Sequence, residues 1–345
     1  MRALTDYDLE GLRATFESWG CKASQADRIL LDFYKYAGHV DLARLNLGRA
    51  LLGRLRTHIP LRQSGVLARH ESRDGTVKLL LGLERGGAIE TVLMPTGTKE
   101  RAAGCISSQV GCAMGCAFCA STRGGLERNL ESGEMIEQFL HLKEQALATG
   151  RRLATVVFMG SGEPLLNLDN VVAATKRIAG PALGDVGWRQ VTVSTVGIVP
   201  GILKLAAMKL RITLALSLHA PDDETRSRIV PANKRYGVRE IVAATKRFSE
   251  LTGRVTNVEY CLIAGVNDSD GHARALAALL DGFRTHVNLI PCNSIGAGFV
   301  APPLGRQQQF LRLLRNAGVV AHLRCTRGDD VSAACGQLRG VRREA

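Results

Sequence analysis

The sequence lacks the features that membrane-spanning, secreted and repetitive proteins require. No apolar run approaches the length of a membrane span, and the first residues, MRALTDYD, contain no hydrophobic region of a signal peptide. Neither an internal repeat nor a low-complexity linker interrupts the 345 residues. Because a chain of this length suffices for one large domain or two, these absences predict a globular cytoplasmic protein with no membrane partner.

Acidic residues are also scarce relative to basic ones. The chain has 45 Lys and Arg against 32 Asp and Glu, which gives a net charge of +13. Two interpretations remain open: a generally basic, solvated surface, or an electrostatic footprint for nucleic acid. Charge alone does not distinguish RNA from DNA.

The nine cysteines do not read as a secreted disulfide framework, because three of them fall within eight residues. Cys112, Cys116 and Cys119 form the pattern C-x-x-x-C-x-x-C, which suits three thiolates converging on one inorganic centre. Three protein ligands leave one iron of a [4Fe–4S] cube open. An open metal position is typical of a catalytic rather than a structural site. The motif therefore predicts cluster chemistry.

The main alternative to a cluster is a zinc site. Cys105, seven residues upstream of Cys112, offers a fourth sulfur. Structural zinc usually takes two separated knuckles, and no second knuckle is present. The spacing thus favours the cluster over zinc, and also over free core cysteines, which need no fixed spacing. The structural interpretation is kept for the remaining cysteines, Cys21, Cys261, Cys292 and Cys325.

The first 95 residues predict an accessory α+β domain with a possible role in RNA binding. Apolar residues recur at helical spacing within residues 1–60, notably in 8–19 and 24–36. Residues 66–94 change to strand-like runs, with hairpin turns expected at AspGly 74–75 and GlyGly 86–87.

Residues 96–345 predict a larger α/β unit. From about residue 104 strands and helices alternate, which indicates βαβ units around a parallel sheet. The expected strands are 155–159, 190–195, 211–218, 254–260, 287–290 and 319–323. The cysteine loop should follow a first strand near 104–110, at the edge where such sheets build their sites.

The cysteine motif resembles the signature of the radical S-adenosylmethionine (SAM) enzymes. Further segments resemble the RlmN/Cfr family of RNA adenine methyltransferases: CISSQVGC (105–112), GGLERNL (124–130), MGSGEPLLN (159–167), LALSLHAP (214–221), GVNDS (265–269), NLIP (288–291) and TRGDDVSAACGQL (326–338). The resemblance implies an open partial (β/α)6 barrel of the radical SAM type, preceded by the small α+β domain. It also implies a [4Fe–4S] cluster, SAM and a one-electron donor such as flavodoxin or ferredoxin.

The same resemblance names the residues that contact SAM. Gly162 and Glu163 would hold its amino group, although the residues alone favour a plain strand-to-helix turn at GSGE (160–163). The remaining expected contacts lie at or just beyond predicted strand ends and comprise Ser194, Ser217, Leu218, His219 and Asn293.

Catalytic roles also follow from the resemblance. Cys335 would be methylated by one SAM, and a second SAM would generate the radical that removes a hydrogen from this methyl group. After addition to the base, Cys105 would form a disulfide with Cys335 and release methylated adenine, while Glu90 removes the ring proton. Cys335 lies in a polar segment that we expect to be flexible.

The implied substrate is carbon 2 of adenine 2503 in 23S ribosomal RNA, with adenine 37 of transfer RNA as a possible second one. PLLN (164–167) favours this branch over carbon 8 or a paralogue acting on another RNA. A radical SAM enzyme without an RNA substrate and a zinc-stabilised RNA-binding module are the more distant alternatives. A target base must leave its stack, and the arginines expected to hold its phosphates are Arg123, Arg128, Arg324 and Arg327.

Overall fold

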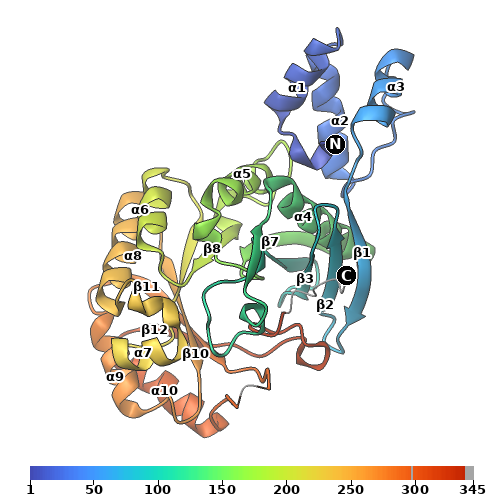
Figure 1. Ribbon diagram of the computed structural model, residues 1–345. Helices are drawn as coiled ribbons and strands as arrows, with labels where there is room; N and C mark the ends of the chain where they lie inside the picture. The colour runs from blue at the N-terminus through green and yellow to red at the C-terminus, as the bar shows by residue number, and fades with distance from the viewer. Residues whose placement is uncertain (297, 339–345) are drawn as a thin grey trace.

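The computed structural model describes residues 1–296 and 298–338. Figure 1 shows a helical N-terminal unit standing above a curved sheet whose outer face is covered by helices. The N-terminal unit holds α1 (Leu9–Ser18), α2 (Ala23–Lys35) and α3 (Arg49–His58), so the two expected helices are confirmed. None of the described helices has the length and hydropathy needed to span a bilayer.

One ten-stranded sheet organises the rest of the described chain, in the order β1-β2-β3-β4-β7-β8-β9-β10-β11-β12. Its first four strands pair antiparallel, whereas every pair from β4 to β12 is parallel. The strands are β1 (Ser64–Glu71), β2 (Val77–Leu83), β3 (Ala88–Pro95), β4 (Arg101–Ile106), β7 (Arg152–Phe158), β8 (Val191–Thr195), β9 (Thr213–Ser217), β10 (Thr256–Leu262), β11 (Thr285–Pro291) and β12 (Val320–Leu323).

Helices make the crossovers that parallel strands require. They are α4 (Ser132–Ala148), α5 (Leu168–Ala179), α6 (Val199–Ala207), α7 (Asp223–Ile229), α8 (Val238–Thr252), α9 (Asp270–Leu279) and α10 (Leu304–Asn316). β1 and β12 end the strand order without pairing to each other. The expected open β/α barrel is therefore confirmed, and each of its six expected strands overlaps an observed one.

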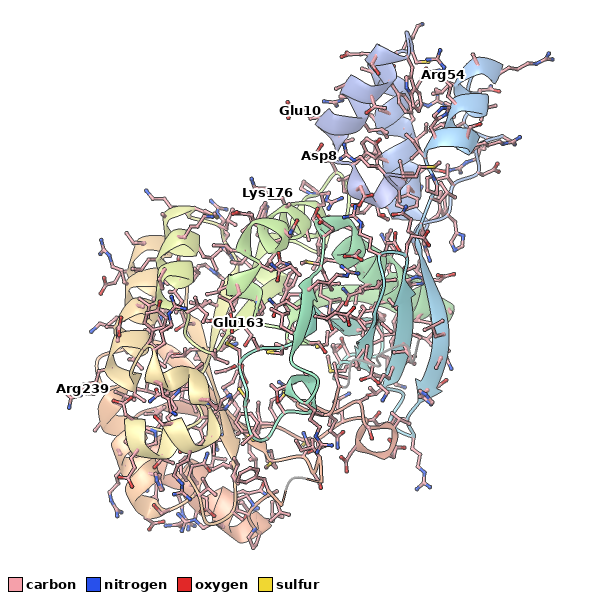
Figure 2. All side chains as sticks on the ribbon, viewed as in Figure 1. Asp8, Glu10, Arg54, Glu163, Lys176 and Arg239 are labelled. Atoms are coloured by element: carbon pink, nitrogen blue, oxygen red, sulfur yellow. The ribbon has the colours of Figure 1, made fainter. Side chains whose placement is uncertain are left out.

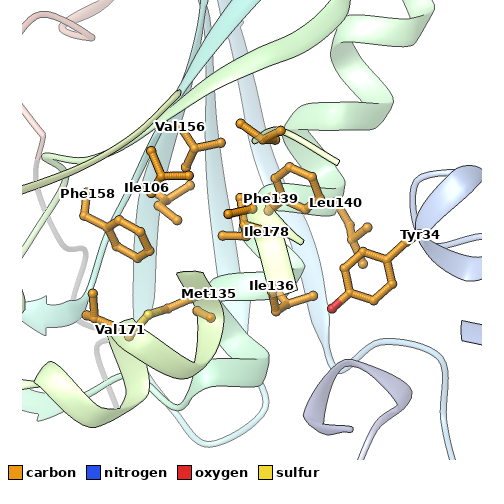
Figure 3. Close-up of a cluster of buried hydrophobic side chains, with 14 of the residues drawn as sticks. Tyr34, Ile106, Met135, Ile136, Phe139, Leu140, Val156, Phe158, Val171 and Ile178 are labelled. Atoms are coloured by element: carbon orange, nitrogen blue, oxygen red, sulfur yellow. The ribbon is translucent and has the colours of Figure 1, made fainter. Parts of the chain in front are cut away.

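The main core lies between the start of the barrel and its first helices. Phe139, Val156 and Phe158 are at most 1% exposed there, and burial of such a side chain stabilises the fold by about 1.5–3 kcal/mol. Figure 3 shows the ring of Tyr34, from α2, next to Ile136 and Leu140 of α4. The N-terminal helices thus share their core with the first crossover of the barrel.

Two details differ from a simple division at residue 95. β3 pairs with β4, with Val92 opposite Cys105, so the sheet runs without a break across the expected boundary. The expected strand near 104–110 ends at Ile106, because the next residues turn away to pair in a separate hairpin of β5 (Gln109–Gly111) and β6 (Leu126–Asn129). The turns expected at 74–75 and 86–87 are confirmed. A division into two domains stays a prediction.

Candidate active site

Two adjoining cavities open at the carboxyl ends of the parallel strands. The first cavity has an open volume of about 940 Å³ and is lined by the three motif cysteines and by residues that follow β7, β8, β9 and β11. The second cavity, of about 1180 Å³, lies toward β3 and β4. Cys119, Asn293 and Cys335 line both. Figure 2 places Glu163 inside the molecule, whereas Lys176 and Arg239 lie on its outer helices.

The cysteine loop is held by backbone hydrogen bonds. The N–H of Cys112 donates to the carbonyl of Gly125 at 2.9 Å, and the N–H of Ala117 donates to that of Ile229 at 2.9 Å. Gly111, just before the first cysteine, has φ +73°, and a Cβ there would lie 2.0 Å from the Gly125 oxygen. Only glycine fits this close approach, so the loop that presents the thiols is sterically specified.

The three thiols interact through their charges. Burial raises the pKa of Cys112 to about 11 and raises those of Cys116 and Cys119, and repulsion from neighbouring sulfurs adds to the effect at Cys112 and Cys116. Binding to a metal centre would lower these pKa values again, because a coordinated thiol is deprotonated. In the described ranges no three His, Cys, Asp or Glu side chains lie close enough to share one metal ion.

Gly162 and Glu163 form the opposite wall of the first cavity. Gly162 has φ +105°, and a Cβ there would meet Gln109 at 2.6 Å. Glu163 is 2% exposed, and its carboxylate accepts hydrogen bonds from the N–H groups of Val196 at 2.8 Å and Leu165 at 3.0 Å. Burial outweighs these bonds and raises the pKa of Glu163 to about 7. An approaching ammonium group would favour the ionised form.

The serines and His219 extend the same cavity across β8 and β9. The hydroxyls of Ser194 and Ser217 are 3.2 Å apart, and both residues line the cavity. His219 lines the cavity too, and its ring lies edge-on to that of Phe118, with 4.7 Å between the ring centroids. The side chain of Leu218 packs instead into the hydrophobic core, so only its backbone is available to a ligand.

The state of His219 follows from its hydrogen bond. Its Nδ1 accepts from the N–H of Cys261 at 3.0 Å, so a neutral ring carries its proton on Nε2. Burial, together with the charge of Arg226, lowers the pKa of His219 to about 3. The ring is therefore neutral at physiological pH and presents an N–H donor.

Asn267 fixes the backbone at His219, a role that the sequence did not predict. His219 has φ +63°, which is uncommon for a residue other than glycine. The Asn267 amide donates to the carbonyls of His219 at 2.7 Å and Cys261 at 2.6 Å, and accepts from the N–H of Ile263 at 2.7 Å. Asn267 is fully buried. The motif that contains it, GVNDS, was the only sequence signal.

Arg226 is a second residue whose role the sequence did not predict. Its buried guanidinium donates to the carbonyls of Leu218 at 2.8 Å and Val196 at 2.5 Å, which joins the ends of β8 and β9.

Glu259 on β10 is a third residue whose role the sequence did not predict. Its Oε1 accepts from Asn288 at 2.9 Å, whereas its buried Oε2 has no hydrogen-bond partner within the described structure and the residue lines the first cavity.

Cys105 and Cys335 meet at the second cavity. Cys105 lies on β4, and its carbonyl accepts from the Thr91 hydroxyl at 2.7 Å. Burial raises the pKa of Cys105 to about 12, and that of Cys335 to about 11. Cys105 and Cys335 both line the second cavity, and Cys105 packs with Ala333 and Leu338 on either side of Cys335 in sequence. The exposed area of Cys335 faces the two cavities that it lines.

The segment that carries Cys335 is connected to distant parts of the chain by hydrogen bonds. The N–H of Gly328 donates to Asp74 at 3.1 Å, and the N–H of Arg73 donates to Asp330 at 3.2 Å. The amide of Asn293 donates to the carbonyl of Cys335 at 3.0 Å. The expected flexibility of the segment stays a prediction.

Glu90 lines neither cavity, although it lies on β3 two residues from Val92, which lines the second. Its carboxylate pairs with Lys78 at 2.9 Å, and both side chains are about 10% exposed. Strand neighbours two residues apart point to the same face. The expected base thus lies beside the cavity, held by a lysine that the sequence gave no reason to select.

The four expected RNA-contacting arginines differ in their surroundings. Arg128 pairs through both terminal nitrogens with Glu134, at 2.7 and 2.9 Å, and therefore serves local structure. Arg324 and Arg327 are exposed and line the second cavity. Arg123 is exposed and donates to the carbonyl of Ile295. The last three remain available at the surface.

Among the cysteines interpreted as structural, Cys261 and Cys292 are buried. They pack with Cys116 in a small hydrophobic cluster, and Cys261 lines the first cavity. Cys21 is partly buried and Cys325 is exposed.

Comparison with known proteins matches this architecture. Residues 106–277 match the model of the radical SAM superfamily. The chain is 50% identical to "Probable dual-specificity RNA methyltransferase RlmN 1" of Opitutus terrae over 347 residues, with 99% of this chain and 98% of that protein covered. It is 43% identical to the RlmN protein of Desulforamulus reducens, with 97% and 95% covered.

A solved structure agrees with these relatives. The crystal structure of a radical SAM methyltransferase from Sphaerobacter thermophilus superposes with a TM-score of 0.93 at 41% identity, covering 98% of this chain and 99% of that one. Identity of this extent over the whole chain shows common family membership. The chain belongs to the RlmN family of radical SAM methyltransferases.

Proposed function

We propose that this protein methylates carbon 2 of an adenine in RNA, with adenine 2503 of 23S ribosomal RNA as the first substrate and adenine 37 of transfer RNA as a second. The observation that carries the proposal is the position of Cys335. It lines both cavities, and Cys105 lines the second with it. A cysteine shared in this way suits a methyl carrier between a SAM site and a base site.

The first cavity fits a [4Fe–4S] cluster and SAM. Cys112, Cys116 and Cys119 would hold the cluster, and Glu163 the ammonium group of SAM. The Ser194 and Ser217 hydroxyls, the backbone at Leu218, the His219 N–H and the Asn293 amide offer further polar contacts. When bound, the two groups supply reductive cleavage of SAM and a carbon radical that removes an unactivated hydrogen. A flavodoxin- or ferredoxin-type donor would supply the electron.

The second cavity would hold the target adenine. Cys335 loses its proton and takes a methyl group from SAM, and after hydrogen removal its methylene carbon bonds to carbon 2 of the ring. Glu90 accepts the ring proton. The electron left on the ring by radical addition would return to the redox centre held by Cys112, Cys116 and Cys119. The Cys105 thiolate then attacks the sulfur of Cys335, so that an S–S bond forms as the S–C bond breaks. The released methylene carbon takes up a proton, and methyladenine leaves. A thiol reductant returns both cysteines to the starting state.

The test is anaerobic and uses the full chain with its cluster reconstituted. Deproteinised 23S RNA, SAM and a reductant are added, and digested RNA is compared with 2- and 8-methyladenosine standards by mass spectrometry. We expect 2-methyladenosine with the wild type and none with Cys335→Ala. Formation of 8-methyladenosine would move the product to the other carbon. SAM cleavage without any methyladenosine would overturn the RNA substrate.

A further inference from the structure

The buried side chain of Lys78 makes two contacts that link separate parts of the proposed machinery. Its ammonium group lies 2.9 Å from a carboxylate oxygen of Glu90. It also donates to the carbonyl of Ser332 at 3.1 Å. Ser332 lies three residues before Cys335, so one side chain contacts both the expected base and the segment of the methyl-carrying cysteine.

The surroundings make these contacts interdependent. With backbone atoms included, Lys78 is 8% exposed and Glu90 is 7% exposed. A buried ammonium group needs partners for its three N–H donors, because unpaired charge is poorly tolerated away from water. If the Cys335 segment moves away, Lys78 loses the Ser332 carbonyl as a partner, and water can reach its ion pair with Glu90. The orientation of Glu90 then depends on whether this segment is docked.

The neighbouring contacts reinforce the same docking. Asp74 and Arg73, in the turn that precedes β2, bind Gly328 and Asp330 of the Cys335 segment. Lys78 follows that turn on β2 and extends the link to β3 through its ion pair with Glu90. The turn binds the Cys335 segment, whereas Lys78 connects this segment with the carboxylate of Glu90.

We propose that Lys78 is a positioning residue that couples the orientation of Glu90 to docking of the Cys335 segment. This inference rests on the proposed function. Its consequence is that the ring proton is removed only while Cys335 is seated between the two cavities. Proton removal before the base is joined to the protein is thereby avoided.

The experiment compares Lys78→Met, Lys78→Arg, Glu90→Gln and the double variant Lys78→Met/Glu90→Gln. Arg85→Met is the matched control, since it breaks the exposed pair of Arg85 with Glu131. Each reconstituted protein receives SAM, reductant and 23S RNA. Protein mass spectrometry measures methylated Cys335, denaturing gels measure the covalent protein–RNA adduct, and nucleoside analysis measures methyladenosine. Hydrogen exchange of the backbone amides measures how firmly residues 328–336 are docked.

Lys78→Met should still methylate Cys335, accumulate the adduct and form methyladenosine about 100-fold more slowly, within the range of general-base contributions. Exchange across 328–336 should rise. Lys78→Arg, which retains the charge, should recover much of the rate, and Arg85→Met should match the wild type.

The double variant separates coupling from general damage, because removing both charges avoids leaving one buried and unpaired. It should be no slower than Glu90→Gln alone, since Lys78 acts through Glu90. Multiplicative slowing, or wild-type product formation by Lys78→Met, would overturn the proposal. So would failure of Lys78→Met to methylate Cys335 at all, which would limit Lys78 to folding of the segment. A wild type that neither methylates Cys335 nor forms the adduct would instead overturn the proposed function.

Discussion

The parallel and antiparallel halves of the sheet build their walls of the site in different ways. On the parallel side, Glu163, Ser194 and His219 follow successive strand ends, so the architecture itself brings them together. On the antiparallel side, Cys335 reaches its place through contacts between residues more than 250 positions apart, such as Lys78 with Ser332. The first wall is specified by local motifs and topology, whereas the second depends on long-range docking.

The comparison implies that cofactor binding and methyl transfer are separable. Cys116→Ser and Cys105→Ala provide the sharpest test, because each removes one thiol from one wall. Cys116→Ser should lose cluster iron, SAM cleavage and product together. Cys105→Ala should keep iron and SAM cleavage but stop at the covalent protein–RNA adduct, since the attacking thiol is gone. Iron analysis, assay of 5′-deoxyadenosine and denaturing gels distinguish the two.

A full iron content in Cys116→Ser would contradict the assignment of the cluster ligands. Loss of iron in Cys105→Ala would show that the walls are not independent. Cys21→Ser, remote from both cavities, serves as the control for loss of a thiol.

The parallel wall should be the more costly one to disturb in stability. Asn267→Ala removes the amide that satisfies the carbonyls of His219 and Cys261 and the N–H of Ile263. Because unsatisfied buried polar groups are destabilising, we expect a loss of about 3 kcal/mol in the free energy of unfolding. Urea denaturation measures it. A loss below about 0.5 kcal/mol, the size of a typical surface change, would argue against this role.

The same wall should give SAM binding a defined pH dependence. Burial raises the pKa of Glu163 to about 7, so below pH 7 the SAM-free carboxyl holds a proton that an ammonium group must displace. SAM affinity should therefore rise with pH up to about 7, by at most about tenfold per unit, and level off above it. Glu163→Gln should bind SAM about ten- to a hundredfold more weakly at pH 8, the loss of a charged hydrogen bond.

Equilibrium dialysis at pH 5.5 to 8.5 measures both effects. Affinity in Glu163→Gln should vary little with pH over this range. A wild type whose affinity is equally flat would remove Glu163 from the ammonium site.

The two walls also differ in what the sequence could predict. The barrel and its strands follow from periodicity. The choice of Glu163, Ser194 and His219 came from the family resemblance, and the topology places these residues at the ends of neighbouring strands. The roles of Lys78, Asn267 and Glu259 could not be predicted, because burial of a polar side chain depends on partners far along the chain. The docking contacts of the Cys335 segment could not be predicted for the same reason: its composition is that of a loop, and their partners in the turn before β2 lie far along the chain.

The smallest expected effect concerns that docking. Burial acts to raise the pKa of Asp74, but hydrogen bonds from Thr76, Ser72 and Gly328 outweigh it and leave the pKa lowered. The pKa of Asp330 is lowered by hydrogen bonds from Ser72 and Arg73. A carboxyl with a lowered pKa stabilises the folded form above its ordinary pKa and loses this contribution as the pH falls through the lowered value. Docking of residues 328–336 should therefore weaken below about pH 4.

At pH 7, Asp74→Asn and Asp330→Asn should each raise hydrogen exchange of residues 328–336 about two- to fivefold, since exposed interactions contribute little. Asp185→Asn, which breaks the exposed pair with Arg152, should leave this exchange unchanged. If the two variants exchange no faster than the wild type, the turn before β2 does not hold the segment, and Lys78 and Asn293 must order the antiparallel wall.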